Sequence, residues 1–298
     1  MSKALYLQKN TSDNFLLDKF EKHLRETDHA ERSIRSYMQE IRSFSEWFSN
    51  RFGNCLKAVS PLDIVEYRQF LQAENKVPGT VNHYLRVIGL FFKWLTDEGL
   101  IRDYPMKNVK GVSAAETLAP KWLTRIEQAA LMRAVREGNN LRDEAIIGIM
   151  LHTGLRVSEV CALDRNYLHI GERSGKVIVR KGKGSKYREV PLNRTVRKIL
   201  SLWLAENLEG PLFKSRRGSP VSARGVFDIV SKYAYRAKLK DVSPYALRHT
   251  FCKNAVDMGV PIDHVAIMAG HSSLDTTKKY TAPSMNDLEA AVEKLAWE

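Results

Sequence analysis

The sequence predicts a mainly α protein with two domains: a small all-helical domain, then a mostly helical domain with a small antiparallel sheet. Its 298 residues are enough for two ordinary domains, each with its own core. Apolar residues recur every three or four positions through the first hundred residues, as in packed helices. A clear β pattern is confined to residues 176–192. We therefore expect domains at residues 1–105 and 121–298, with a linker over residues 106–120.

Four helices are predicted in the first domain. The first two are expected around residues 15–24 and from Ser33 onward, where apolar residues form one stripe. Ser60-Pro61 has the residue types of an N-cap and a first helical position, so it opens the third helix. Pro78-Gly79 is expected to break the chain, and Thr80 then begins the fourth helix. Together these helices predict a compact bundle.

Helices dominate the second domain as well. Thr124 and Glu127 form a capping box before an apolar run. A hairpin is expected to join residues 176–180 to residues 187–192 through a glycine-bearing turn. Further helices are predicted over 124–134, 142–152, 194–207, 223–239, 245–258 and 262–268. A last amphipathic helix, about 285–296, is expected to start at Ser284 and to carry Leu288, Val292 and Leu295 on one side.

The chain is strongly basic, with 47 Lys and Arg residues against 34 Asp and Glu residues and a net charge of +13. Such an excess favours a polyanionic partner, because each neutralised phosphate releases counterions. The helical domain also has a basic and polar face, made by Arg32, Arg35, Arg42, His83 and Arg86. That face suits a DNA backbone, although a merely solvated helix surface gives the same pattern.

Composition argues against several other classes of protein. No apolar run approaches the roughly 20 residues that span a bilayer. The N-terminus lacks the basic-then-apolar layout of a secretory signal. Cys55, Cys161 and Cys252 are odd in number and widely spaced, which does not suit a disulfide framework. We therefore expect a cytoplasmic protein with no membrane partner.

Two arginines, a histidine and a tyrosine form a pattern that suits covalent attack on a phosphodiester. Guanidinium groups can neutralise the non-bridging oxygens, and a phenol can be the nucleophile. Arg156 follows a glycine at a helix end, Arg248 lies 23 residues before His271, and Tyr280 follows nine residues later. Each fragment alone has a plainer explanation. Arg156 could simply pair with Glu159. Tyr245 and Arg248, three residues apart on one face of a helix, could be an ordinary surface pair.

The motifs around these residues resemble those of the tyrosine recombinases, the integrase family that includes the Xer recombinases and many transposon resolvases. The resemblance covers nearly the whole chain. It runs through Thr-Gly-Leu-Arg-Val-Ser-Glu, Gly-Lys-Gly-Ser-Lys-x-Arg-x-Val-Pro-Leu, Leu-Arg-His-Thr-Phe and Gly-His-Ser-Ser-x-x-Thr-Thr-x-x-Tyr-Thr, in that order. It implies a SAM-like core-binding domain followed by a catalytic domain, in a site-specific recombinase that acts through a 3′-phosphotyrosyl intermediate.

The resemblance also implies partners and residue roles. The partners are double-stranded DNA and further copies of the chain in a homotetramer on two sites, with room for an accessory or partner recombinase and with no cofactor. The helix at about 285–296 would dock on a neighbouring protomer. Arg156 and Arg248 would be the catalytic arginines, His271 would lie near the scissile phosphate, Tyr280 would be the nucleophile, and Glu159 would support the site.

The family's catalytic lysine lies in the Gly-Lys-Gly turn of the hairpin. That turn contains Lys181, Lys183 and Lys186 in this chain, and the pattern selects Lys183, with Lys181 as the second candidate. An ammonium there could protonate the leaving 5′-oxygen. A turn lysine that only touches backbone phosphate is the other interpretation.

One position departs from the family pattern. Most relatives have a histidine three residues before the second arginine, where this chain has Tyr245. A phenol can donate a hydrogen bond, but with a pKa near ~10 it is a poorer proton shuttle than an imidazole. We expect Tyr245 to act as a donor and the arginines to lower the pKa of Tyr280. His249 lies about 100° around the helix from Arg248, so it is not expected to take over as the base.

Alternatives concern metals and biological role. The spacing of His249, Cys252, His264 and His271 matches no compact zinc motif, so no metal site is expected. The helical domain begins almost at the first residue, which favours an Xer-like or transposon-borne recombinase at paired short inverted-repeat sites. A phage- or element-type integrase is the alternative among enzymes. A non-catalytic DNA-binding protein with the same fold is the alternative from another class.

Overall fold

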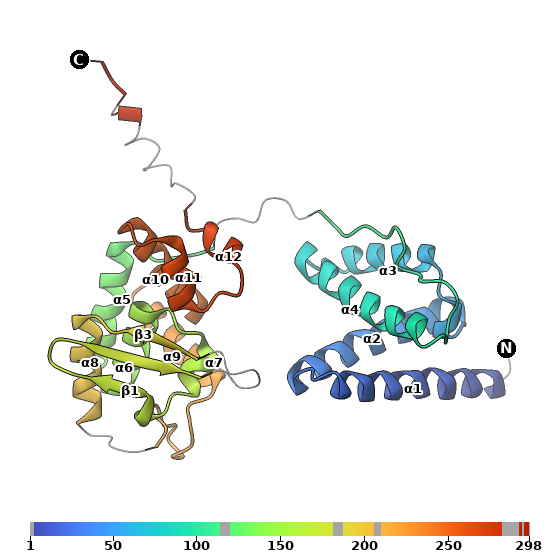
Figure 1. Ribbon diagram of the computed structural model, residues 1–298, viewed down its shortest axis with the longest axis horizontal. Helices are drawn as coiled ribbons and strands as arrows, with labels where there is room; N and C mark the ends of the chain where they lie inside the picture. The colour runs from blue at the N-terminus through green and yellow to red at the C-terminus, as the bar shows by residue number, and fades with distance from the viewer. Residues whose placement is uncertain are drawn as a thin grey trace. The chain divides into compact units, whose positions relative to one another are not determined.

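The protein folds into two compact units, Met1–Thr117 and Leu118–Glu298, in the computed structural model (Figure 1). The structure describes residues 3–113, 120–180, 187–205, 210–281, 292–293 and 295–297, with backbone only for residues 3–12. Each unit has its own hydrophobic core. The predicted fold class, mainly α with a small antiparallel sheet in the second unit, is confirmed.

The described part of the first unit contains four long helices, as predicted. They are α1 (Lys3–Glu26), α2 (Glu31–Phe52), α3 (Pro61–Ala73) and α4 (Pro78–Asp97), with a 3₁₀ turn at η1 (Leu56–Ala58). Pro78 begins α4 instead of breaking the chain. Proline suits the first helical position because its fixed φ is helical and its missing N–H would have no partner there.

Aromatic packing joins three of these helices. Phe44 of α2 is fully buried, and its ring meets Tyr67 of α3 edge-on at 4.9 Å and Phe92 of α4 at 6.0 Å. Such contacts add stability beyond the buried area. The helix face of the first unit that was predicted to be basic is basic only in part. Nε2 of His83 lies 3.1 Å from the Glu40 carboxylate, whereas Arg32, Arg35, Arg42 and Arg86 are exposed.

The second unit combines short helices with a three-stranded sheet. Its described helices are α5 (Arg125–Glu137), α6 (Leu141–Thr153), α7 (Val157–Cys161), α8 (Arg194–Leu204), α9 (Ala223–Arg236), α10 (Pro244–Asp257), α11 (Ile262–Ala269) and α12 (Asp275–Lys278), with a 3₁₀ turn at η2 (Arg165–Tyr167). Nearly all of α6 is buried, and α8 and α10 pack against it. An apolar helix of this kind forms the centre of a domain. Here α6 leads directly into Gly154 and Arg156, so it fixes where these two residues lie.

The strands are β1 (Leu168–Ile170), β2 (Gly175–Val179) and β3 (Arg188–Pro191), antiparallel in the order β1-β2-β3. Val177 pairs with Val190 in the register, so both face the core. The antiparallel pairing of the predicted hairpin is therefore confirmed, whereas its turn at residues 181–186 lies outside the described residues. Strand β1 was not predicted, because three residues are too few to show a period of two.

The C-terminal helix predicted at about 285–296 lies mostly outside the described residues. Val292 and Leu295 are described, and both are exposed. Within the described part of the chain, no helix is both long and apolar enough to cross a membrane.

Candidate active site

Four residues singled out by the sequence come from distant segments and meet in the second unit. Arg156 precedes α7, Arg248 lies in α10, His271 follows α11 and Tyr280 follows α12. The rings of His271 and Tyr280 are nearly parallel, with centroids 6.3 Å apart. Both arginines are close enough to His271 to repel a proton from it. The fold therefore brings two cations, an imidazole and a phenol into one cluster.

Glu159 is the shared partner of two arginines. Its carboxylate accepts a hydrogen bond of 3.0 Å from Arg156 and two bonds, of 2.9 and 2.8 Å, from Arg188. A paired arrangement of this kind fixes the planar guanidinium group in one orientation. Burial alone would raise the pKa of Glu159, but the bonds from Arg188 and from the backbone N–H of Arg156 outweigh it and hold the pKa below its usual range. The carboxylate is therefore ionised at neutral pH.

Two glycines at helix ends hold Arg248 and Arg156. Gly154 ends α6 with φ +64°, and its carbonyl accepts a 2.6 Å hydrogen bond from Nη1 of Arg248. Gly270 ends α11 with φ +68°, and its carbonyl accepts from Nη2 of Arg156. The last carbonyls of a helix lack partners within it and carry negative partial charge. Guanidinium groups therefore suit both positions.

Substituting Gly154 by alanine is expected to destabilise the second unit by about 2–5 kcal/mol. The left-handed backbone is costly for alanine, and the added Cβ would lie 2.4 Å from Cδ1 of Phe251. Chemical denaturation monitored by circular dichroism measures the loss. Gly259→Ala is the matched control, because Gly259 has φ +78° but open space around it. Its cost is expected to be only about 1–2 kcal/mol, and equal losses in both variants would contradict the steric argument.

Arg248 is almost fully buried, with 6% of its surface exposed. Burial and the nearby Arg156 lower the pKa of its guanidinium group, which nevertheless remains charged. A buried cation in contact with a carbonyl, close to a second cation, is a strong site for an anion. A phosphate group would relieve the repulsion between the two arginines.

His271 is held as a neutral imidazole. Its Nδ1 lies 2.7 Å from the hydroxyl of Thr277, a fully buried residue of α12. Burial, together with Arg248 and Arg156, lowers the pKa of His271 to about 4. At neutral pH the ring can accept from Thr277 at one nitrogen and donate from the other.

Tyr280 is completely buried in a small apolar cluster with Cys252, Val265 and Ala269. Burial raises its pKa and the nearby Cys252 raises it further, while Arg248 acts in the opposite direction. Arg248 thus lowers this pKa as expected, but the net shift is upward. Desolvation of the phenolate outweighs the charge of Arg248.

The Tyr280 hydroxyl has two hydrogen-bond partners in the described cluster, the imidazole of His249 and the thiol of Cys252. Nδ1 of His249 lies 2.5 Å from Oη of Tyr280, and the two rings are 5.7 Å apart between centroids. We did not expect His249 to take over as the base, because it is about 100° around α10 from Arg248. That angle does not separate His249 from the nucleophile, because Tyr280 approaches α10 from the side on which His249 lies.

Tyr245 lies near the beginning of α10 and is 55% exposed. Its ring packs edge-on against Phe227 of α9, with centroids 5.8 Å apart. Its role as a hydrogen-bond donor therefore stays a prediction. Lys183, Lys181 and Lys186 lie outside the described residues, so the choice of catalytic lysine also stays a prediction.

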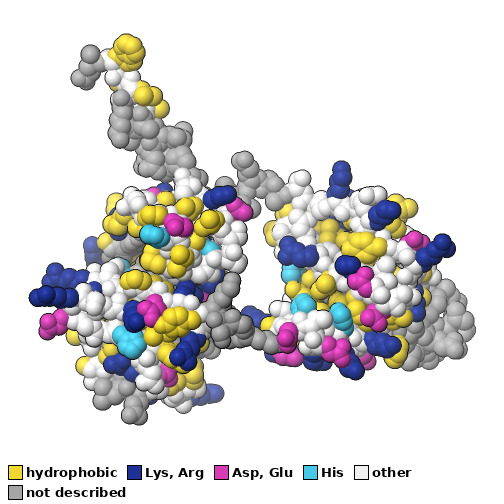
Figure 2. Space-filling view, in the orientation of Figure 1, with side chains coloured by type: hydrophobic (Ala, Val, Ile, Leu, Met, Phe, Trp, Pro, Cys, Tyr) yellow, Lys and Arg dark blue, Asp and Glu magenta, His cyan; other side chains and the backbone are white. Residues whose placement is uncertain are grey.

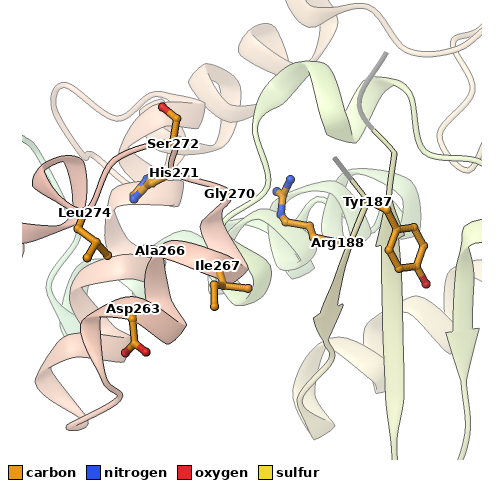
Figure 3. Close-up of a pocket in the computed structure, with 9 residues that line it drawn as sticks. All are labelled: Tyr187, Arg188, Asp263, Ala266, Ile267, Gly270, His271, Ser272 and Leu274. Carbon is orange, nitrogen blue, oxygen red and sulfur yellow. The ribbon is translucent and has the colours of Figure 1, made fainter. Parts of the chain in front are cut away.

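A pocket of about 350 Å³ lies between β3 and α11 (Figure 3). Arg188 and His271 line it on either side of Gly270, and Ile267 and Leu274 give it an apolar wall. Hydrophobic side chains gather over this part of the unit in the space-filling view (Figure 2), where both of these residues are largely exposed. Arg248 and Tyr280 do not line the pocket, so it meets the cluster at His271 and Arg188.

The predicted absence of a zinc site was argued from sequence spacing. Among the side chains that the structure describes, no three His, Cys, Asp or Glu residues are grouped so as to hold a metal ion.

Sequence reasoning missed two residues of the cluster, Arg188 and His249. Arg188 could have been found from the period of two in β3, which puts it on the same face as the buried Val190. His249 gave no such signal, because its partner arrives from a segment 31 residues later in the chain.

Taken together, a basic chain with a phenol, two arginines and two histidines clustered in a helical unit has the makeup of an enzyme that acts on phosphodiesters. Residues 16–102 match the phage integrase N-terminal SAM-like domain, and residues 121–287 match the phage integrase family. The chain belongs to this family, the tyrosine recombinases, which are DNA strand-exchange enzymes. The family expected from the sequence motifs is thereby confirmed.

Relatives of the chain match it over nearly their full lengths. Tyrosine recombinase XerC of Myxococcus xanthus is 32% identical over 294 residues, covering 94% of this chain and 96% of that protein. The TnP I resolvase of Bacillus thuringiensis is 28% identical over 285 residues, covering 93% and 98%. Among solved structures, XerH site-specific recombinase bound to a palindromic difH substrate matches with a TM-score of 0.76 and 24% identity, covering 93% of this chain and 83% of that chain. A Tn1549 transposon integrase in complex with a circular intermediate DNA matches with a TM-score of 0.75 and 19% identity, covering 94% and 99%.

Proposed function

We propose that the protein is a site-specific recombinase that cleaves DNA with Tyr280 and forms a 3′-phosphotyrosyl bond. The convergence of Arg156, Arg248 and His271 around the buried Tyr280 carries this proposal. Attack on an anionic diester needs fixed positive charge at the non-bridging oxygens and donors for the charge that develops. The cluster supplies both.

Each residue has a role in the proposed step. Arg156 and Arg248 bind the non-bridging oxygens, since a guanidinium has five N–H donors and the glycine carbonyls use only part of them. His271 donates to the same phosphate, and Glu159 holds Arg156 in position. Lys183 protonates the leaving 5′-oxygen, and Tyr245 donates a hydrogen bond at the edge of the site.

The phosphotyrosyl bond would conserve the energy of the broken diester. Rejoining then needs only a 5′-hydroxyl, so the reaction proposed here uses no nucleotide and no other cofactor. Because the bond energy is conserved, the step is reversible. Reversibility suits a protein that exchanges strands between two sites.

The proposed assembly is a homotetramer on two double-stranded sites, each a short inverted repeat. Residues 1–105 would hold one face of the DNA, residues 106–120 would link the domains, and residues 121–298 would cleave. The segment at about 285–296 would dock on a neighbouring protomer, and the exposed Val292 and Leu295 suit that role. We place the protein on the bacterial nucleoid in the cytoplasm, in an Xer-like or transposon-borne system, in line with relatives named recombinase and resolvase. An accessory or partner recombinase would fit the same scheme.

A nicked duplex tests the proposed chemistry directly. A nick just downstream of the scissile phosphate lets the short 5′-hydroxyl strand diffuse away, so the covalent intermediate accumulates. Nicked duplexes tiled across the DNA that flanks the gene are expected to give one denaturant-resistant protein–DNA adduct, with the DNA on the peptide that contains Tyr280. Specific binding without any adduct would instead support a non-catalytic DNA-binding protein and would sink the proposal.

A further inference from the structure

The substitution at position 245 leaves the proton of the nucleophile without an obvious acceptor. Tyr280 must lose its hydroxyl proton as its oxygen attacks phosphorus. Tyr245 occupies the position at which the family resemblance implies a histidine. It is 55% exposed, and its ring packs against Phe227. A phenol is a weak acceptor at neutral pH. Another group in the cluster must therefore accept this proton.

His249 has the geometry of that acceptor. Its Nδ1 lies 2.5 Å from the hydroxyl oxygen of Tyr280, a direct contact of the kind that a general base needs. In the neutral tautomer with its proton on Nε2, Nδ1 of His249 accepts the hydrogen bond from the phenol, and this is the tautomer that the proposed step uses. His249 is the residue next to Arg248 on α10, and the same helix thus supplies a phosphate-binding cation and a base.

The surroundings of His249 keep it ready to accept a proton. Burial, Lys279 and Arg248 lower the pKa of His249 to about 4. His271 and the thiol of Cys252 are the other titratable groups that face this pair. All of the charged neighbours are cations, which favours the neutral imidazole. A bound phosphate would add negative charge and stabilise the imidazolium that forms.

We propose that His249 accepts the proton of Tyr280 during DNA cleavage, in place of the histidine that position 245 lacks. The inference rests on the proposed function. As the Oη–P bond forms and the P–O5′ bond breaks, the Tyr280 proton moves to Nδ1 of His249. The leaving 5′-oxygen takes a different proton from the acid, Lys183. In rejoining, the 5′-hydroxyl returns its proton to Lys183 as its oxygen bonds to phosphorus. The P–Oη bond breaks, and His249 returns its proton to the Tyr280 oxygen.

Other members of the cluster suit this task less well. Nδ1 of His271 is occupied by the Thr277 hydroxyl, and its ring lies face to face with Tyr280 at an interplanar angle of 15°. Cys252 lies close to Tyr280, but burial raises the pKa of its thiol, so it is not a thiolate at neutral pH. His249 alone in the described cluster combines a neutral ring with a nitrogen directed at the attacking oxygen.

The test is His249→Asn, assayed on the nicked duplex that captures the wild-type adduct. The amide oxygen of asparagine can occupy the place of Nδ1 and accept the hydrogen bond, but it cannot take the proton. Cleavage at pH 7 is expected to slow by on the order of 10²–10⁴-fold. The variant must react through the phenolate, so its rate should rise about tenfold per pH unit below the pKa of Tyr280. The wild-type rate should stay nearly flat over the same range and fall only as pH approaches about 4.

His264→Gln is the matched control, because His264 is an exposed histidine on α11. It is expected to cleave at the wild-type rate, and thermal melting checks that His249→Asn is folded. A wild-type rate and a flat pH profile in folded His249→Asn would overturn the proposal. Faster cleavage would also overturn it, because the contact between His249 and Tyr280 would then hold the nucleophile back. A wild-type protein that forms no adduct on any tiled duplex would overturn the proposed function itself.

Discussion

Replacing Tyr280 with phenylalanine is expected to abolish the covalent adduct while the protein stays folded. The substitution removes only the attacking oxygen. The ring keeps its place among Cys252, Val265 and Ala269 and against the face of His271. Loss of the hydrogen bond to His249 is partly offset by removal of a buried hydroxyl, so the free energy of unfolding should change by about 1 kcal/mol or less. Denaturing gels with the nicked duplex measure the adduct, and thermal melting measures the fold.

Tyr235→Phe is the matched control for this variant. Tyr235 lies in α9 of the same unit and is 85% exposed, so its hydroxyl has no place in the cluster. This variant should form the adduct at the wild-type rate. An adduct of normal yield on the Tyr280→Phe protein would place the nucleophile at another residue and would contradict the site described above.

Replacing Glu159 with glutamine is expected to destabilise the second unit by about 3–5 kcal/mol, the usual cost of breaking a buried ion pair. The side chain keeps its size, but Arg188, which is only 9% exposed, loses the carboxylate that binds two of its nitrogens. Arg156 loses its fixed orientation as well, so cleavage by the folded fraction should also slow. Urea denaturation gives the first quantity, and the nicked-duplex assay gives the second.

The pH dependence of this loss has a definite sign. The folded protein holds the pKa of Glu159 below its usual value, so the ionised carboxylate stabilises the fold above the unfolded pKa of about 4.3. The stability difference between wild type and Glu159→Gln should be full at neutral pH and shrink as pH falls through the lowered pKa. Asp228→Asn breaks an exposed pair with Arg224 and should cost about 1 kcal/mol or less. If the two variants lost equal stability, the buried carboxylate would have no special role.

The fold could be predicted from the sequence where local signals were strong. Helix α3 begins at Pro61 as expected, because the Ser60-Pro61 start is a local feature of the sequence. Strand β1 escaped prediction because three residues hold too little pattern, and its pairing with β2 is set by the tertiary structure. Helix α4 began at Pro78 because a proline that ends one segment can also start the next.

The cluster was predicted as a set of residues, but its contacts were not. Motif order pointed to Arg156, Arg248, His271 and Tyr280, and the structure brings them together. Which imidazole meets the phenol depends on how the chain after α12 returns to α10, a long-range property that helical geometry alone does not give. The pKa of Tyr280 was misjudged for a related reason, because the sequence shows nearby charges but not the depth of burial.

The two glycine carbonyls that bind Arg248 and Arg156 bear on how such an enzyme can change. Main-chain oxygens belong to every residue type, so neighbouring side chains in α6 and α11 can vary without moving these anchors. Gly154 and Gly270 themselves have little freedom, since an added Cβ would strike Phe251 or Arg188. Evolution or protein design can thus alter the DNA-facing surfaces to reach new target sequences, while the carbonyls of Gly154 and Gly270 keep the two arginines in place.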